Sequence, residues 1–433
     1  MFSLTDFNKH YELLKDYADN MQIIDTHEHI NPHKNYQGDE PDVLRDYLSH
    51  YITTDLLSAG MSVQDLDKIK DAKNDLHKRC KLLEPYLNQV KNTSYYRSLE
   101  LAVQKIHNVN EISANTIEEL NAKYIKAVSQ KDYGRYIMKD ICNIEVSIND
   151  NWEDDMRLST TDLFAPVWQP NTYLNYTDSV ITQNAIGNNV NIENLSLDEY
   201  CEHYKKHFHK QVTDGAVALK LAVAYWRSLY FEDVSYKEAS ELFLNAVKAK
   251  DSFPKKLQDY IMHMIINTAN ENNFVIQIHT GLQEGMGNNL ENSNPMLLKN
   301  LFDKYPNVIF DLFHTGYPYE RELAVLAKTH ANVYVDFCWT HLISPFAARN
   351  AFYEMLDVLP YTKIFAFGGD YLFYDGVVGH LILAKQNICT VLAQKVTNNE
   401  CDIALAKEIL QAVLYDNAKR VFKSVSYPQR DIV

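Results

Sequence analysis

The sequence predicts an α/β protein, a (β/α)8 TIM barrel with a helical insertion after its first strand. Eight short apolar runs recur along the chain, at residues 23–24, 141–146, 163–168, 216–223, 274–279, 308–313, 333–337 and 364–367. Segments with helical periodicity separate several of these runs, at residues 236–250, 256–270, 295–304 and 321–329. Apolar strands joined by helices are typical of a parallel sheet covered on both faces, and eight such units favour a closed barrel. No glycine-rich phosphate-binding loop follows any run, which argues against a nucleotide-binding sheet.

The first hundred and thirty residues differ from the rest in their pattern. Residues 4–20 have helical periodicity, and the first strand follows them. Residues 41–132 contain no convincing strand: Pro41 suits a first helical position, and Ser62, Thr93 and Asn115 are expected N-caps of further helices. We therefore expect one domain, residues 1–433, with a lid-like helical insertion at 41–132.

The composition bounds the class of protein. Apolar residues make up 46% and charged residues 23% of the chain, as in a soluble globular protein with a large core. The formal net charge of −15 argues against nucleic acid or an anionic membrane surface as a partner. There is no signal-like start and no apolar run approaching eighteen residues. The six cysteines form no Cys-x-x-Cys pair, which favours reduced thiols. We expect a cytoplasmic protein with a small-molecule substrate, and leave association into a homo-oligomer open.

Two histidines follow the first apolar run at alternate positions, His27 and His29. Residues two apart in a strand project from the same face, so the two imidazoles form half of a site for a divalent metal such as zinc. Glu28 points the other way and is expected to be structural.

Further polar residues end four later strands. They are Lys220 on the fourth, His279 on the fifth, His314 on the sixth and Asp370 on the eighth. Each has an ordinary alternative, because a strand-end histidine can be a hydrogen-bonded core residue, a lysine can extend to the rim, and an aspartate can cap a helix. All of them converge on one end of one barrel, however, where the active sites of this fold lie. We therefore predict a metal site there.

This set of residues resembles the amidohydrolase superfamily. The resemblance rests on the strand-end residues above and extends to residues 24–32, 314–319, 332–336, 367–370 and 416–422, which are similar to its amidohydrolase 2 branch. That branch includes decarboxylases of the aminocarboxymuconate-semialdehyde type, and the insertion is placed as in the related uronate isomerases. The resemblance covers most of the chain and implies a metal-dependent enzyme without specifying its substrate.

The expected chemistry is that of a divalent ion, zinc first, held by His27, His29, His279 and Asp370. A bound zinc lowers the pKa of its water to about 7. Asp370 is the expected catalytic base that takes the water's proton and passes it to the leaving group. The resemblance implies two versions: a carboxylated Lys220 bridges two ions with His279 and His314 on the second, or His314 contacts substrate or water beside one ion. Both versions stay open.

Three residues beyond the strand ends are candidates for contact with the substrate. Arg227 could bind a substrate carboxylate with two parallel hydrogen bonds. Tyr225 lies in the same loop, and His341 follows the seventh strand. Residues 95–97 of the insertion could roof the pocket. A packing or surface role is the alternative for each.

Three functions are compatible with these features. The first is a metal-dependent hydrolase of an amide, ester or lactone in a small, carboxylated molecule, which Lys220 favours. The second is a uronate-type isomerase or a non-oxidative decarboxylase on the same metal site, which the insertion favours. The third is a binding or scaffold protein on a barrel that has lost its activity, against which the complete set of ligand positions argues.

Overall fold

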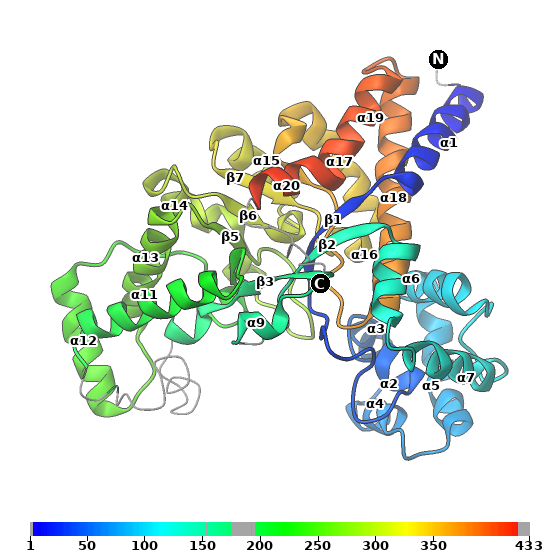
Figure 1. Ribbon diagram of the computed structural model, residues 1–433, viewed down its shortest axis with the longest axis horizontal. Helices are drawn as coiled ribbons and strands as arrows, with labels where there is room; N and C mark the ends of the chain where they lie inside the picture. The colour runs from blue at the N-terminus through cyan, green and yellow to red at the C-terminus, as the bar shows by residue number, and fades with distance from the viewer. Residues whose placement is uncertain (1–2, 153, 175–191, 193–194, 423–433) are drawn as a thin grey trace, which may run out of the picture.

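The computed structural model describes residues 3–152, 154–174, 192 and 195–422, and its centre is a parallel sheet in which each strand pairs with the next along the chain (Figure 1). The strands are β1 Ile23–Glu28, β2 Ile144–Asn149, β3 Phe164–Trp168, β4 Ala218–Leu221, β5 Val275–Ile278, β6 Phe310–Leu312, β7 Val333–Asp336 and β8 Ile364–Phe365. Backbone bonds just past β8 bring the sheet round to β1, with Thr26 N donating to Phe367 O at 3.1 Å. The predicted eight-stranded TIM barrel is confirmed.

Helices on the outside cover the barrel. They are α11 Leu197–Thr213, α12 Tyr236–Ala249, α13 Lys255–Glu271, α14 Lys299–Lys304, α15 Glu320–Thr329, α17 Pro345–Val358, α18 Tyr374–Thr397 and α19 Ile403–Gln411, with α1 Leu4–Asn20 ahead of β1. Short turns complete the connections: α9 Met156–Ser159, η3 Pro170–Leu174, η5 Val223–Tyr225, η6 Leu290–Ser293, η7 Pro295–Leu298, η8 Phe313–Gly316, α16 Thr340–Ile343, η9 Tyr361–Lys363, η10 Ala412–Asp416 and α20 Asn417–Val421.

All regular structure between β1 and β2 is helical, and it forms a separate layer beside α18 at the lower right of Figure 1. The layer comprises α2 Val43–Tyr47, α3 Ile52–Ser58, α4 Val63–Lys70, α5 Leu76–Val90, α6 Ser94–Ala102, η1 Val103–His107, α7 Ile117–Val128, α8 Tyr133–Arg135 and η2 Tyr136–Ile141. Ser62 and Thr93 cap α4 and α6 through their side chains, as predicted. Asn115 does not cap α7: that helix follows Thr116, whose hydroxyl is bonded to Glu111 O instead.

Two apolar cores follow from the alternation of strand side chains. Ile23 belongs to the main core between the sheet and the helices, whereas Ile24 belongs to a second cluster with Val167, Phe365 and Phe422. Strand residues that face away from the helices meet inside the barrel, which α20 and the residue after it close at one end. The cavity described below lies at the other end.

Helix α18 is long and apolar enough, by length and composition, to cross a membrane. In this protein 83% of its most apolar window is buried, because it packs against α1, α6 and α17. It therefore has the surroundings of a core helix.

Candidate metal centre

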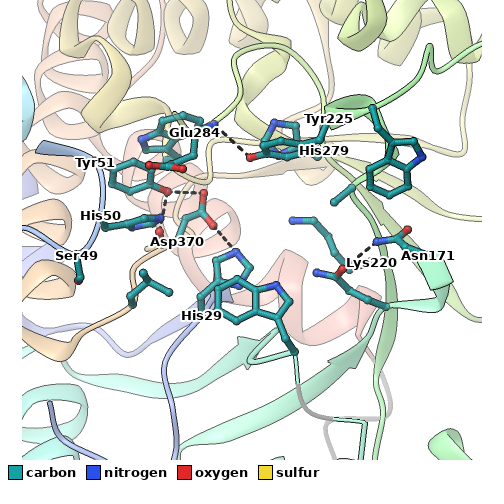
Figure 2. Close-up of a pocket in the computed structure, with 16 residues that line it drawn as sticks. His29, Ser49, His50, Tyr51, Asn171, Lys220, Tyr225, His279, Glu284 and Asp370 are labelled. Atoms are coloured by element: carbon teal, nitrogen blue, oxygen red, sulfur yellow. Dashed lines mark hydrogen bonds and ion pairs between the residues drawn. The ribbon is translucent and has the colours of Figure 1, made fainter. Parts of the chain in front are cut away.

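A cavity of about 460 Å³ opens at the carboxyl ends of the strands (Figure 2). The predicted residues His29, Lys220, Tyr225, His279 and Asp370 all line it. Pockets of this size hold small organic ligands rather than macromolecules. The cavity thus lies where the active site of this fold is expected.

His27, His29 and Asp370 form a compact group of possible ligands. Asp370 Oδ1 lies 3.2 Å from His29 Nε2 and 3.8 Å from His27 Nε2, and one ligand atom from each residue falls within 4.8 Å of the others. Ligands bound tetrahedrally to zinc at about 2.0–2.1 Å are roughly 3.3 Å apart, so the spacing suits one such ion. His27 Nδ1 is buried with no hydrogen-bond partner among the described residues.

The hydrogen bonds of His29 determine which of its nitrogens can bind a cation. Nδ1 lies 2.5 Å from the carbonyl oxygen of Asp150, and because a carbonyl only accepts, Nδ1 carries the proton. The lone pair of Nε2 then faces the Asp370 carboxylate. Two acceptors facing each other at 3.2 Å require a cation or an extra proton between them. This arrangement fits a divalent ion.

A second pair of facing acceptors lies beside the first. His279 Nε2 donates to Leu282 O at 2.9 Å and His314 Nδ1 donates to Cys338 O at 2.8 Å. The remaining nitrogens, His279 Nδ1 and His314 Nε2, lie 3.1 Å apart. Burial lowers the pKa of both imidazoles, that of His314 to about 4. At neutral pH neither ring therefore readily takes up a second proton that could bridge the two facing nitrogens. The pair has the chemistry of half of a second ion site.

Lys220 lies between the two pairs. Its side chain is buried, with Nζ 3.1 Å from His27 Nε2 and 3.8 Å from the centre of the Phe313 ring. Burial lowers the pKa of Lys220, which favours the neutral amine. A neutral lysine at this place can serve as a ligand or react with carbon dioxide.

The loop after β8 is fixed by buried acidic residues of β1. Asp25 Oδ1 accepts from Gly369 N at 3.0 Å and Glu28 Oε2 accepts from Tyr371 N at 2.7 Å. A Cβ on Gly369 would lie 1.7 Å from Glu28 Oε1, so any other residue there would displace the Glu28 carboxylate. Asp370 itself adopts a left-handed conformation, with φ of 58°. Glu28 therefore has a positioning role, as expected from the sequence.

The insertion contributes a residue that sequence reasoning missed. Tyr51, immediately before α3, donates its hydroxyl to Asp370 Oδ2 at 2.6 Å, and its ring stacks on Trp339 with centroids 4.6 Å apart. His50 lines the same cavity, and burial lowers its pKa to about 3. Tyr51 belongs to the apolar helical pattern of the sequence, which gave no sign of a contact more than three hundred residues away.

Two of the three predicted substrate contacts do not reach the cavity. Arg227 is buried and its guanidinium binds Asp259 Oδ1 at 2.5 Å, so it holds the loop after β4 to α13. His341 is buried behind β8, with Nε2 donating to Ala366 O at 3.0 Å. Both predictions were wrong because distance from a strand end does not give the direction of a side chain. Tyr225 does line the cavity, with its ring centroid 4.9 Å from that of His279.

Residues 95–97, which were predicted to cover the pocket, make three different kinds of contact. Tyr95 stacks on Tyr51 at 5.3 Å between ring centroids and thus supports the site from behind. Tyr96 is buried in the insertion, and Arg97 is exposed and bonded to Gln386 of α18. Strand seven, from which no ligand was expected, places Cys338 with His314 and Asp370. Burial raises the pKa of its thiol well above the usual range, so Cys338 is a weak ligand.

Comparisons with known proteins find similarity in sequence and in fold. The family model for amidohydrolases matches residues 237–423. Protein fluG of Emericella nidulans is 25% identical over 272 residues, a match that covers 58% of this chain and only 31% of fluG. A glucuronate isomerase from Caulobacter crescentus has a similar structure, with a TM-score of 0.80, 18% identity and coverage of 99% of this chain and 97% of that one. A uronate isomerase from Thermotoga maritima is also similar, with a TM-score of 0.77 and 16% identity. The match covers 96% of this chain and 97% of that one.

The structural likeness shows that the barrel fold is shared, with a candidate metal site at the carboxyl ends of its strands. The family match agrees with the resemblance seen in the sequence. Residues 237–423 match the amidohydrolase family, and the chain as a whole shares the barrel fold of the two isomerases.

Proposed function

We propose that the protein is a metal-dependent hydrolase that cleaves an amide, ester or lactone bond in a small molecule. The observation that carries the proposal is the set of ring nitrogens on His29, His279 and His314 that are not bonded to a backbone carbonyl and lie close to the Asp370 carboxylate or to one another. Zinc is the metal we propose first, because imidazole and carboxylate ligands suit it.

The residues of the site have separate tasks. When bound, a divalent cation supplies Lewis acidity toward a carbonyl and lowers the pKa of water. Asp370 would accept the proton of the attacking water and pass it to the leaving group. Tyr51 holds the other oxygen of that carboxylate, which fixes the direction of proton transfer. The insertion is therefore part of the proposed machinery.

Lys220 favours the version with two ions. Its neutral amine would form an N–C bond to carbon dioxide and lose a proton to solvent, which places a carbamate beside His27. His279, whose Nδ1 faces His314 Nε2 at 3.1 Å, lines the same cavity as Lys220. The resulting anionic oxygens would complete both ligand sets.

The lining of the cavity suggests a compact substrate with apolar or planar parts. Tyr225, Trp226 and Trp152 line it and are each about half-exposed. Among the lining residues that the structure describes, Lys220 is the only lysine or arginine. The expectation of a carboxylated substrate rested on Arg227, which is committed to Asp259, so we no longer infer a carboxylate.

A uronate-type isomerase is the second candidate. It is favoured by the whole-chain likeness to the two uronate isomerases and by the insertion, which supplies His50 and Tyr51 to the cavity. A decarboxylase has no observation of its own in its favour. A cytoplasmic location and a homo-oligomeric state remain proposals from the sequence.

A substrate panel separates the candidates. Protein reconstituted with zinc or manganese would be assayed against lactones, esters and N-acyl amino acids, and in parallel against D-glucuronate and D-galacturonate. We expect hydrolysis of at least one member of the first group, lost in Asp370→Asn. Turnover of the uronates alone would replace the hydrolase by the isomerase. No turnover in either group, with no bound metal, would favour a binding protein.

A further inference from the structure

A second cavity, of about 360 Å³, lies where α1, η1, η2 and α18 meet, and it shares no lining residue with the cavity at the barrel mouth. In Figure 1 this region is on the right, where α1 and α18 run side by side. Cavities that hold small organic ligands begin at about 300 Å³, so the space suits a compact metabolite.

The charged groups of this cavity are unevenly matched. Lys15, Lys105 and Lys385 line it together with one carboxylate, Asp19. Asp19 Oδ2 binds Lys15 Nζ at 2.5 Å, and its Oδ1 lies 3.8 Å from Lys385 Nζ. Three ammonium groups against one carboxylate leave a surplus of two positive charges. This surplus is unusual in a chain with a formal net charge of −15.

Lys385 contributes most to the case for a ligand. Its side chain is only 11% exposed, and its one ion pair among the described residues is the long contact to Asp19. Burial lowers the pKa of this ammonium group, which means that its charge is poorly compensated. A buried charge without a close partner is costly, and an anion in the cavity would supply that partner.

Apart from Cys142 and Gln386, the rest of the lining is apolar. Ile141 of η2 and the residues Val378, Leu381 and Ile382 of α18 form this part. The cavity therefore combines a cationic part with a hydrocarbon surface. Inorganic ions alone would leave that surface uncovered, whereas an organic anion covers both parts.

We propose that this cavity binds a small organic dianion, a phosphate monoester or a dicarboxylate, with its anionic group between Lys105 and Lys385 and its hydrocarbon part against Val378 and Leu381. Two negative charges balance the surplus of two positive ones. Lysine suits both anions, because its ammonium group acts as a point charge.

Titration calorimetry on the full-length protein tests the proposal. The probe is phenyl phosphate, with glutarate as the dicarboxylate and benzyl alcohol as the neutral counterpart. We expect both dianions to bind with one site and benzyl alcohol not to bind. Lys105→Met and Lys385→Met should each weaken binding by roughly tenfold or more, the usual loss of a charged hydrogen-bond partner.

Two further variants test where the ligand binds and whether it is negatively charged. Asp19→Asn removes the only carboxylate of the cavity and should tighten binding severalfold. Lys248→Met, on the exposed face of α12 at the far left of Figure 1, removes the same charge at a distance and should leave binding unchanged. Since Lys105 is exposed, its variant tests the site even if the Lys385 variant fails to fold.

The outcomes are distinct. Tighter phenyl phosphate than glutarate identifies a phosphate site, and the reverse order identifies a dicarboxylate site. Absence of binding by both dianions at millimolar concentration overturns the proposal. Equal binding by the wild type and the Lys105 variant overturns it as well, because the ligand then lies elsewhere.

Discussion

At the scale of single residues, the site depends on which atoms of a side chain are already occupied. His29, His279 and His314 each donate one ring N–H to a backbone carbonyl. The other nitrogen of each ring is thereby left as an acceptor facing the cavity or its neighbour. Backbone carbonyls thus select the tautomers that a metal ion requires.

Tyr51→Phe tests the contribution of the insertion to the site. The variant keeps the stacking on Trp339 but loses the hydrogen bond to Asp370 Oδ2. Removing such a support of a ligand typically weakens metal binding about 10–100-fold, and we expect that loss in a competition titration with a chelator. Tyr95→Phe is the matched control, since Tyr95 belongs to the same stack and none of its described hydrogen bonds reaches Asp370. Equal losses in the two variants would contradict a specific role for Tyr51.

His341→Gln tests the structural role now assigned to His341. Burial lowers the pKa of His341 to about 4, below the usual value of 6.5 for histidine. Between these values the unfolded chain binds a proton that the folded protein does not. His341 therefore contributes a rise of folding stability with pH across this window, of up to about 1.4 kcal/mol per pH unit, on top of the contributions of other groups.

The glutamine variant should lack the contribution of His341, so its slope should be smaller, while it keeps a donor for Ala366 O. Chemical denaturation of metal-free protein at pH 4.5, 5.5 and 6.5 would measure the two slopes. Parallel slopes for wild type and variant would show that His341 does not carry the effect.

At the scale of elements, α18 connects the barrel to the insertion. Its His380 Nδ1 donates to Gly369 O at 2.9 Å, one residue before Asp370. Its Asp375 accepts from the Tyr47 hydroxyl of α2 at 2.6 Å and contacts His107 Nε2 of η1 at 2.8 Å. One helix therefore sets both the β8 loop and the layer that carries Tyr51.

Gly379→Ala tests the close packing of α18 on α6. Glycine to alanine within an exposed helix normally stabilises it by about 1 kcal/mol. Here the new Cβ would lie 1.9 Å from Ser98 O, a backbone atom that cannot rotate away. We expect a loss of unfolding free energy of roughly 1–3 kcal/mol, measured by denaturant titration.

A second substitution separates the backbone clash from a side-chain clash. Ser98→Gly removes the hydroxyl but leaves the carbonyl in place, so it should not rescue Gly379→Ala. A Gly379→Ala protein that is more stable than the wild type would contradict the packing described for this helix pair.

At the scale of the whole molecule, the parallel barrel explains which features the sequence could predict. Parallel strands bring their carboxyl ends to one rim, so His27, Lys220, His279 and Asp370 had to lie near one another once the strands were located. The local patterns also located most strand centres, although β1 extends to Glu28, well beyond the two residues expected.

Contacts that depend on three-dimensional direction could not be predicted. Tyr51 reads as an apolar helix residue, and its approach to Asp370 depends on how the whole insertion packs on α18. Arg227 and His341 follow strands just as the cavity residues do, but their partners, Asp259 and Ala366, come from neighbouring elements. The spacing of residues in a sequence predicts which residues lie at the rim of the barrel, but not in which direction each side chain points.

The central claim is that a divalent metal binds where β1 and β8 meet. Anomalous diffraction at the zinc edge, from crystals of protein supplied with zinc, measures this most directly. We expect a peak about 2.0–2.2 Å from His27 Nε2, His29 Nε2 and Asp370 Oδ1, absent in Asp370→Asn. A second peak beside His279 and His314, with carbamate density on Lys220, would establish the version with two ions. A wild-type map with no anomalous peak among His27, His29 and Asp370 would contradict the account.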